Sequence, residues 1–525
     1  MRPPVEVLHK FSKPVECLGI AYCAAALREA GFSASMVDGM LHDWTNEETA
    51  NRILELNPDV IGITVVLNYF PEITADLCRL LRNKGFYGKV IVGGHAVSFV
   101  PERVFDIAPE VDAVIIGEGE ETIVNFVKEL ANGDNEKQVL GVSYAGGQKA
   151  SWFPAARQRD LDALPLPARD LTPEVINLDG LVCISTSRGC YARCTFCSIP
   201  RFYGLEKGKT LANGNWLARS AASTVREIQW LHETFGVVEL LVVDDEFFGG
   251  NKLAAISSPV EFAISCRAEN VDPQTLISLM EGGLRHVFVG LETGSDDSLK
   301  LYGKGHSVFQ NKNAVRIIKS LGLSFQPGFM LFNHKSTLSE IRENLEFLSE
   351  IDELKPVTIN TSVEPHFGTP INRVIEHDQL LIDERYKYTS NFRDYKVAYA
   401  KKISQLIADK FSPTQGLIAG LQSAITFEWR RSIPGRSRNI QIAIDKFEKK
   451  CNALFAQIFV DAIDLLDSTP LEEAPFIVEE VNSRLNDAKS KVAVLQAILL
   501  DSICNEEGSV RYYKQTDIIS MKGLK

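Results

Sequence analysis

Three cysteines lie in one eight-residue stretch of the chain, at Cys190, Cys194 and Cys197. Three thiolates this close together can bind three irons of a four-iron cluster, which leaves the fourth iron open to an outside ligand. A structural zinc site usually has four ligands, often in two C-x2-C pairs, and neither a second pair nor a His-x3-His motif follows here. Any disulfide scheme would leave one of the three unpaired. The spacing therefore predicts a catalytic loop whose three cysteines are the metal ligands of a [4Fe–4S] cluster.

Bulk properties exclude several classes of protein. The chain has 525 residues, ten cysteines and a net charge of −12, and its length predicts two or three domains. The negative charge argues against a general nucleic-acid binder. No apolar run reaches the roughly 18 residues of a membrane span, and the N-terminus has no apolar signal core. We therefore expect a cytoplasmic protein, where a reducing environment protects an exposed cluster.

Residues 1–135 alternate between apolar runs and amphipathic stretches. Runs at 35–37, 60–66, 89–92 and 111–116 predict strands, and stretches at 18–30, 47–56 and 72–83 predict helices. This alternation indicates a Rossmann-like parallel sheet that binds a ligand at the carboxyl ends of its strands. No G-x-G-x-x-G opens a helix after the first strand, which argues against a nicotinamide cofactor. The candidate binding residues at the strand ends are Asn68, Gly93, Gly94, His95, Gly117 and Glu118.

The same alternation returns in residues 181–375. Six apolar runs, at 181–186, 238–243, 261–266, 286–290, 324–332 and 357–362, predict a partial (β/α)6 barrel with its site at the carboxyl ends of the strands. An acidic cluster after a buried strand suits an amino group and sugar hydroxyls, and an arginine can bind a carboxylate through two hydrogen bonds. The charged residues at these ends are Asp244, Asp245, Glu246, Arg267 and Glu292.

Two further regions complete the chain. We expect residues 136–180 to connect two domains, and their proline-rich stretch at 160–170, which cannot be a helix interior, predicts an extended strap. Residues 376–525 carry amphipathic runs at 395–410, 439–466, 477–486 and 492–500, which predict a helical domain without strands that caps the site and helps to select the substrate.

The cysteine loop, with Phe196 in C-x3-C-x-F-C, resembles that of the radical S-adenosylmethionine (SAM) superfamily. In that family the amino and carboxylate groups of SAM bind the open iron. The resemblance covers about residues 15–375. It implies that the 244–246 cluster contacts the SAM amino group, that Ser265 and Arg267 contact its ribose and carboxylate, and that 290–293 corresponds to the family's G-I-E-S element around Glu292. Arg188 flanks the cysteines, where it either stabilises thiolates or is a solvated loop charge.

The first region resembles the cobalamin-binding domain of many radical SAM enzymes, through residues 18–22, 92–95 and 116–120. The D-x-H-x-x-G motif of cobalamin proteins with a histidine ligand is missing, since Asp38 and His42 have the wrong spacing. The resemblance therefore implies base-off cobalamin without a histidine ligand. The alternative is a Rossmann-like domain that serves only as a docking platform.

Together these resemblances imply an α/β protein with a cobalamin-binding Rossmann-like domain (1–135), a connector (136–180), a radical SAM partial barrel (181–375) and a helical C-terminal domain (376–525). They imply a class B radical SAM methyltransferase, which methylates an unactivated carbon of a small-molecule or peptide natural-product intermediate through a 5′-deoxyadenosyl radical and methylcobalamin. An electron donor such as flavodoxin or ferredoxin would be a partner. The alternatives are a non-methylating rearrangement or oxidative cyclisation, methylthiolation of RNA, and a non-catalytic metal-binding scaffold.

Overall fold

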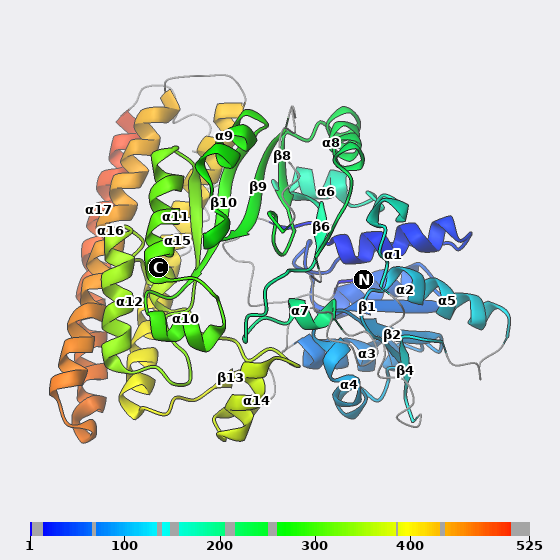
Figure 1. The fold of residues 1–525 in the computed structure, drawn as a ribbon, viewed down its shortest axis with the longest axis horizontal. Coiled ribbons are helices and arrows are strands. Elements are labelled where there is room, and N and C mark those ends of the chain that lie inside the picture. The colour runs from blue at the N-terminus through cyan, green and yellow to red at the C-terminus, as the bar shows by residue number, and fades with distance from the viewer. Residues whose placement is uncertain are drawn as a thin grey trace. The chain divides into compact units, whose positions relative to one another are not determined.

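The computed structural model describes residues 1–2, 14–65, 70–133, 139–146, 157–204, 216–249, 260–384, 387–430 and 436–505. Within these ranges, residues up to 329 and residues 363–391 form one compact unit, and residues 330–362 and 392–505 form a second. The first unit contains two main sheets, one parallel and one parallel except for its last strand, and the second consists of helices (Figure 1). The domain boundaries expected at 135, 180 and 375 stay predictions.

The first sheet has the strand order β1-β2-β3-β4, in which the first three strands are parallel and the fourth is antiparallel. Neighbouring residues of a strand point to opposite faces. In β2, Val90 and Val92 therefore pack with α2, α3 and α4, and Ile91 packs on the other face with α1 and α5. The elements are β1 (Val60–Thr64), β2 (Lys89–Gly93), β3 (Ala113–Ile115), β4 (Val142–Tyr144), α1 (Leu18–Glu29), α2 (Asn46–Glu55), α3 (Phe70–Asn83), α4 (Pro101–Ile107) and α5 (Glu120–Ala131).

The strand expected over 35–37 is wrong. The backbone hydrogen bonds here join Arg2 to Val37 and Gly39, and a single bridge pairs Arg2 with Asp38. A run of three residues becomes a strand only when a neighbouring strand satisfies its backbone groups, and among the described residues only Arg2 pairs with it. The Arg2 guanidinium also binds the Asp38 carboxylate, at 2.7 Å.

The second sheet has five parallel strands in the order β11-β10-β9-β8-β5, and helices lie between them in the chain. In β9, the buried Phe262, Ile264 and Cys266 alternate with the half-buried Ala263 and Ser265, so Ser265 lies on the less buried face. The elements are β5 (Val182–Ile184), β8 (Glu239–Val242), β9 (Glu261–Arg267), β10 (Leu284–Glu292), β11 (Ser324–Phe329), α6 (Thr172–Asn177), α7 (Ile199–Phe202), α8 (Ala221–Phe235), α9 (Pro273–Glu281), α10 (Asp296–Tyr302) and α11 (Val308–Ser320).

The partial barrel is confirmed, but the strand expected over 357–362 is wrong. Residues Pro356–Ile359 form the short helix α13, and only Ser362 makes a bridge, to Phe332. Proline is well suited to the first turn of a helix, since it fixes φ and lacks the N–H that the first turn leaves unpaired. Apolar content alone could not distinguish this turn from a strand.

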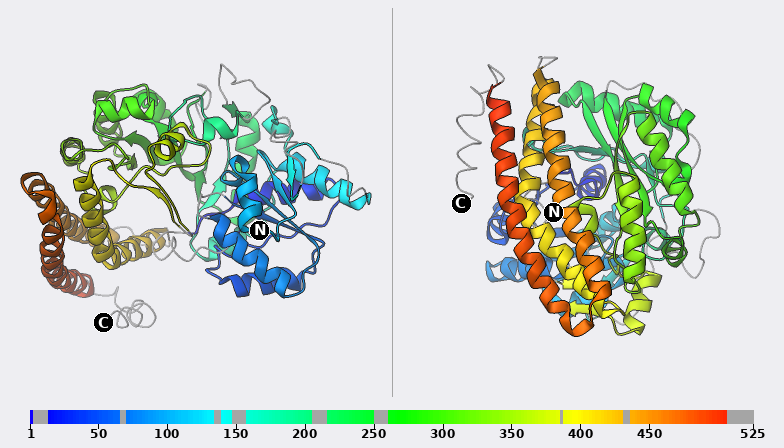
Figure 2. Two further views of the ribbon diagram at one scale, coloured as in Figure 1. Left: turned by 90° about the horizontal axis from the view of Figure 1, so that it is seen from below. Right: turned by 90° about the vertical axis from the view of Figure 1, so that its left-hand side faces the viewer.

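The second unit is helical, as expected from the amphipathic runs. Three long helices, α15 (Tyr395–Arg430), α16 (Arg436–Ser468) and α17 (Ala474–Asn505), lie side by side (Figure 2, right). The runs at 477–486 and 492–500 belong to one helix, α17. A shorter helix, α12 (Leu338–Glu350), belongs to the same unit and contacts α16.

The expectation that strands end before residue 376 is wrong. An antiparallel hairpin follows α14 (Pro370–His377) and consists of β12 (Leu381–Glu384) and β13 (Lys387–Ser390). Its Tyr388 packs on Phe367 with ring centroids 4.5 Å apart and accepts a hydrogen bond from Asn372 at 2.8 Å. These contacts attach the hairpin to the first unit.

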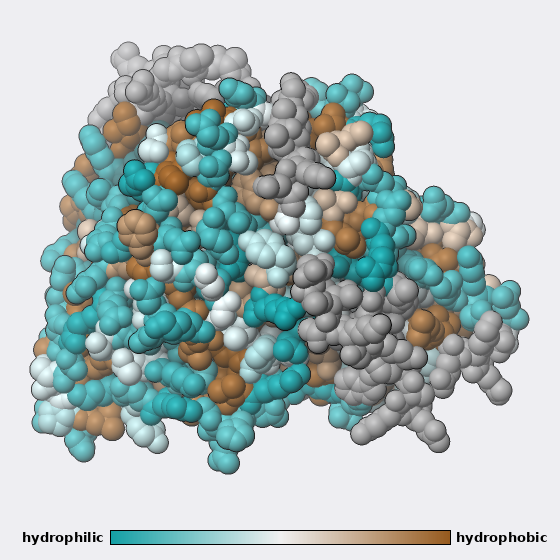
Figure 3. All heavy atoms as spheres, viewed as in Figure 1, coloured by the Kyte–Doolittle hydropathy of each residue, from teal (hydrophilic) through white to brown (hydrophobic). Residues whose placement is uncertain are grey.

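The face in Figure 3 is mostly hydrophilic, with hydrophobic residues in scattered positions. Such scattered apolar side chains are normal for a protein surface. None of the helices in the described ranges is both long enough and apolar enough to span a membrane.

Candidate functional site

The cysteine loop follows β5 and β6 (Ser187–Arg188) at the carboxyl end of the second sheet. Cys194 is buried, and Cys190 and Cys197 are half-buried free thiols. The loop is attached at its centre, where Thr195 N–H donates to Tyr302 O at 2.8 Å and Ile371 N–H donates to Thr195 O at 3.0 Å. The three thiols predicted from the spacing therefore lie on a loop that is hydrogen-bonded to the last residue of α10 and to the first turn of α14.

The sulfur atoms have hydrogen-bond donors. Arg267 Nη1 donates to Cys194 Sγ at 3.1 Å, and Ala192 N–H donates to Cys190 Sγ at 3.4 Å. Burial raises the pKa of Cys190 to about 11 and of Cys197 to about 12, so metal binding must displace their protons. In the described ranges no three His, Cys, Asp or Glu side chains are arranged around a single ion. The donor set fits a cluster instead, because each thiolate would bind a different iron.

The acidic cluster after β8 contains three carboxylates in different environments. Asp244 is buried and accepts hydrogen bonds from Thr186 N–H at 2.7 Å and Ser187 Oγ at 2.8 Å. Glu246 is fully buried and accepts from Arg267 N–H at 2.9 Å. Asp245 is exposed and accepts from Gly189 N–H at 3.0 Å. Asp244 thus fixes the strand that leads into the cysteine loop, and Asp245 is the carboxylate left accessible for the predicted contact with the SAM amino group.

Arg267 is buried and already bonded within the protein. Besides Cys194, its guanidinium donates to the Glu269 carboxylate and to the backbone oxygen of Lys304. A guanidinium has five N–H donors, so two of them remain for the predicted contact with the SAM carboxylate. Ser265, on the half-buried face of β9, reaches the same strand end.

Glu292 has a backbone conformation that is rare for its residue type. Its φ is +67°, in the left-handed region, and Lys304 Nζ donates to its carboxylate at 3.0 Å. Lys304 is 3% exposed. A Cβ at Gly290 would lie 2.7 Å from Glu292 Oε1, so a side chain there would displace the Glu292 carboxylate. Such strain persists where the surroundings impose it, which is common at functional sites. The motif identified Glu292, but its partner Lys304 was not predicted.

The glycines at the ends of the first sheet form two connected loops. Gly94 has a φ of +116°, and a Cβ there would lie 2.4 Å from Val65 O. Gly117 has a φ of +82° and donates its N–H to Ser98 Oγ at 3.0 Å. Ser98 Oγ in turn donates to Gly94 O at 2.7 Å. Ser98 was not predicted, and nothing in its local sequence marks it. Gly93 ends β2 next to Ile115 of β3.

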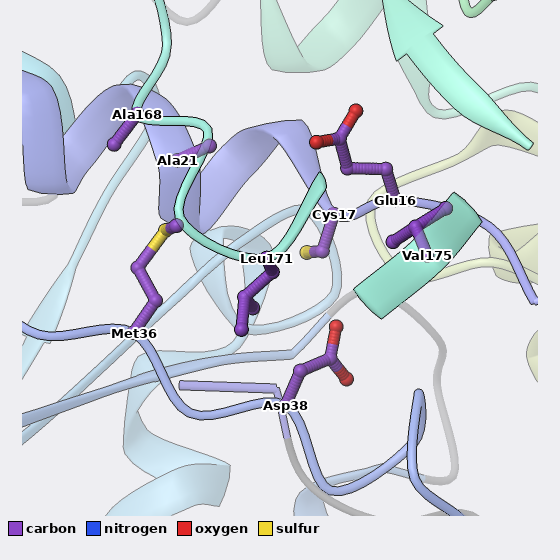
Figure 4. Close-up of a pocket in the computed structure, with 8 residues that line it drawn as sticks. All are labelled: Glu16, Cys17, Ala21, Met36, Asp38, Ala168, Leu171 and Val175. Carbon is purple, nitrogen blue, oxygen red and sulfur yellow. The ribbon is translucent and has the colours of Figure 1, made fainter. Parts of the chain in front are cut away.

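Gly94 and Gly117 take positive φ values that favour glycine, and at Gly94 a Cβ would also meet the Val65 backbone. These turns present backbone rather than side chains, which is compatible with the close approach of a bulky cofactor. Asn68 lies outside the described residues. A cavity of about 10 Å³, about the space of one water molecule, lies elsewhere in this unit, among residues that include Cys17, Met36, Asp38 and Leu171 (Figure 4). That cavity is a packing gap and is too small for a cofactor.

His95 and Glu118, both predicted to bind a ligand, contact the segments around the cysteine loop. The His95 ring stacks on Phe202 of α7 with centroids 3.9 Å apart. Glu118 pairs with Arg188 at 2.7 Å. Phe196, between the second and third cysteines, packs edge-on against Tyr302, with centroids 5.4 Å apart. The strand-end loops of the two sheets therefore meet.

Comparison with known proteins agrees with both halves of this site. Residues 6–127 match the B12 binding domain, and residues 184–348 match the Radical SAM superfamily. The chain is 30% identical over 389 residues to the uncharacterized methyltransferase PH0819 of Pyrococcus horikoshii, which covers 71% of this chain and 81% of that protein. It is 26% identical over 390 residues to the 4'-phospho-dehydrooxetanocin synthase of Priestia megaterium, covering 67% of this chain but only 51% of that protein, about half its length.

A solved structure shares the fold. The cobalamin-dependent S-adenosylmethionine radical enzyme OxsB, with aqua-cobalamin and S-adenosylmethionine bound, superposes with a TM-score of 0.71 at 19% identity, over 96% of this chain and 79% of that chain. Two cofactor-binding domains in one chain, in the same order as the two sheets, agree with the two sets of strand-end loops. The chain therefore belongs to the radical SAM enzymes that carry a B12-binding domain.

Proposed function

We propose that this enzyme methylates an unactivated carbon of a small-molecule or peptide intermediate. The observation that supports this proposal is the direct contact between the two sets of loops, through Glu118 with Arg188 and His95 with Phe202. A methyl group carried on one cofactor reaches a substrate radical made at the other only if both cofactors lie beside one substrate. When bound, SAM supplies a 5′-deoxyadenosyl radical and the methyl group, and cobalamin carries that methyl group.

The protein's own contribution would be binding and orientation. Cys190, Cys194 and Cys197 would hold the cluster, Asp245 would accept hydrogen bonds from the SAM amino group, and Arg267 would donate to its carboxylate. The glycine loops would hold cobalamin through backbone contacts. The buried position of Cys194 and Arg267 keeps water away from this part of the site.

A second candidate is a non-methylating rearrangement or oxidative cyclisation on the same cofactors. It is favoured by the relative named as a synthase, although the alignment covers about half of that relative.

We also propose a cytoplasmic location and reduction by a flavodoxin or ferredoxin, since the cluster requires a low-potential electron donor.

The two candidates differ in how they use SAM. The test begins with anaerobic reconstitution and a count of cobalamin per chain from the optical spectrum. The reconstituted enzyme is then incubated with SAM and a reductant, and the products are separated by mass spectrometry. A methyltransferase forms S-adenosylhomocysteine, by methylation of cobalamin, as well as 5′-deoxyadenosine. A rearrangement enzyme forms 5′-deoxyadenosine alone, and a chain that retains no cobalamin would contradict both candidates.

A further inference from the structure

Arg188 joins the two cofactor-binding regions of the first unit. It lies two residues before Cys190, at the end of β6, whose backbone pairs with β7 (Leu217–Ala218). Its guanidinium binds Glu118 through Nη1 and Glu120 through Nη2, both at 2.7 Å. The guanidinium carbon also lies 4.9 Å from the centroid of the Tyr22 ring in α1. One side chain therefore connects the start of the cysteine loop to the loop after β3.

This contact is not an ordinary surface ion pair. The side chains of Arg188, Glu118 and Glu120 are only 11%, 14% and 12% exposed. Exposed pairs contribute little to stability, whereas removal of one partner from a largely buried pair leaves an uncompensated charge and is strongly destabilising. The backbone next to Glu118 is attached to the loop after β2, because Gly117 N–H donates to Ser98 Oγ and Ser98 Oγ donates to Gly94 O. A continuous set of contacts thus leads from Gly94 to the cysteine loop.

A second contact acts on the other side of the cysteines. Phe202, five residues after Cys197, stacks on His95, which follows Gly94 directly. Arg157 donates to Arg188 O at 3.0 Å, and its guanidinium carbon lies 4.5 Å from the centroid of the Tyr203 ring. The segments before and after the cysteines are therefore both attached to the glycine loops of the first sheet.

We propose that the ion pairs of Arg188 with Glu118 and Glu120 fix the position of the cluster loop relative to the cobalamin loops and couple the two binding sites. This inference rests on the proposed binding of both cofactors. Arg188 is then a positioning residue. Because coupling between binding sites is reciprocal, the assembled cluster should tighten cobalamin binding, and cobalamin should tighten cluster binding by the same factor.

The test compares the dissociation constant of cobalamin for the chain with and without its cluster, by optical titration under anaerobic conditions. In the wild type we expect a ratio of about 5- to 150-fold, the usual range for coupled sites. In Arg188→Gln the ratio should fall towards one, and Arg188→Lys, which keeps the charge but not the planar fork, should restore part of it. A merely structural role would weaken both constants equally and leave the ratio unchanged.

The matched control is Arg28→Gln, which removes an exposed arginine–carboxylate pair with Asp170 at 2.8 Å in the same unit. It should leave the ratio as in the wild type. If Arg188→Gln fails to fold by circular dichroism, Glu120→Gln keeps one ion pair and should still lower the ratio. If the ratio of the two cobalamin dissociation constants were unchanged in the folded variants, the coupling role of Arg188 would be contradicted and the proposed function would stand. A wild type that binds no cobalamin would overturn both.

Discussion

The two sheets of the first unit present their binding residues in opposite ways. The first sheet presents backbone turns, in which Gly94 and Gly117 take positive φ values and one hydroxyl, that of Ser98, connects them. The second sheet uses charged side chains, and most of these, such as Asp244 and Arg267, are already bonded to the protein. Backbone at glycine turns can lie close to a large ligand, whereas a small charged ligand and a cluster require oriented charges. The two regions should therefore respond differently to substitution.

The largest effect should come from the cysteine loop. Cys194→Ala removes one of three cluster ligands and the sulfur that Arg267 contacts, so the iron bound per chain should fall to near zero and SAM cleavage should stop. Cobalamin binding should persist, more weakly. Iron and sulfide analysis with electron paramagnetic resonance measures the first effect. Cys451→Ala, at a buried cysteine of the second unit, is the control and should keep its iron.

Gly94→Ala, in the first sheet, should have the opposite effect: the chain should lose cobalamin and keep its iron. The added Cβ would meet Val65 O at 2.4 Å and the φ of +116° would be strained, which should cost at least about 1–3 kcal/mol and abolish cobalamin binding. The iron content should stay near that of the wild type. Gly31→Ala has a similar φ, +88°, with no atom within 4 Å, so it isolates the effect of strain and should retain cobalamin. Loss of cobalamin from both variants would contradict our account of Gly94.

Two adjacent carboxylates sharpen the contrast within the second sheet. Asp244→Asn weakens a buried acceptor of hydrogen bonds from residues 186 and 187 and should lower the free energy of unfolding by about 1–3 kcal/mol. Asp245→Asn, at an exposed position where an amide oxygen can still accept from Gly189 N–H, should lower stability less and weaken SAM binding instead. Chemical denaturation and equilibrium SAM binding measure the two effects. The reverse result would mean that Asp244 contacts SAM.

The smallest effect concerns pH. Burial against Phe202, with a smaller contribution from His366, lowers the pKa of His95 to about 4. The unfolded chain binds this proton more tightly, since an unperturbed histidine has a pKa of about 6.5. Stability from the neutral ring is therefore complete above about pH 6.5 and is lost as the pH falls towards 4. The free energy of unfolding should decrease between pH 7 and 5, and His95→Phe should flatten this part of the profile. An identical slope in the variant would show that other groups are responsible.

Local signals explain what could be predicted. The cysteine spacing predicted the cluster loop, because three potential ligands of one cluster here lie close together in a single short segment. The period of the apolar residues identified both parallel sheets and the long helices. It failed at 357–362, where Pro356 starts a helical turn, and at 35–37, where among the described residues only Arg2 offers the backbone a partner. In both places the local pattern agrees with more than one structure.

By itself, then, the sequence predicted which residues would carry the chemistry, and it placed them correctly at the carboxyl ends of the parallel strands. Only the tertiary structure decided how they are used. Arg188, which could have been a solvated charge or a thiolate partner, binds Glu118 and Glu120, and Ser98 connects two glycines far apart in the chain. Such pairs form only when separate strand ends lie beside one another in the folded chain. A hydrogen bond between residues distant in the chain produces no periodic or local pattern in the sequence, so it could not be predicted.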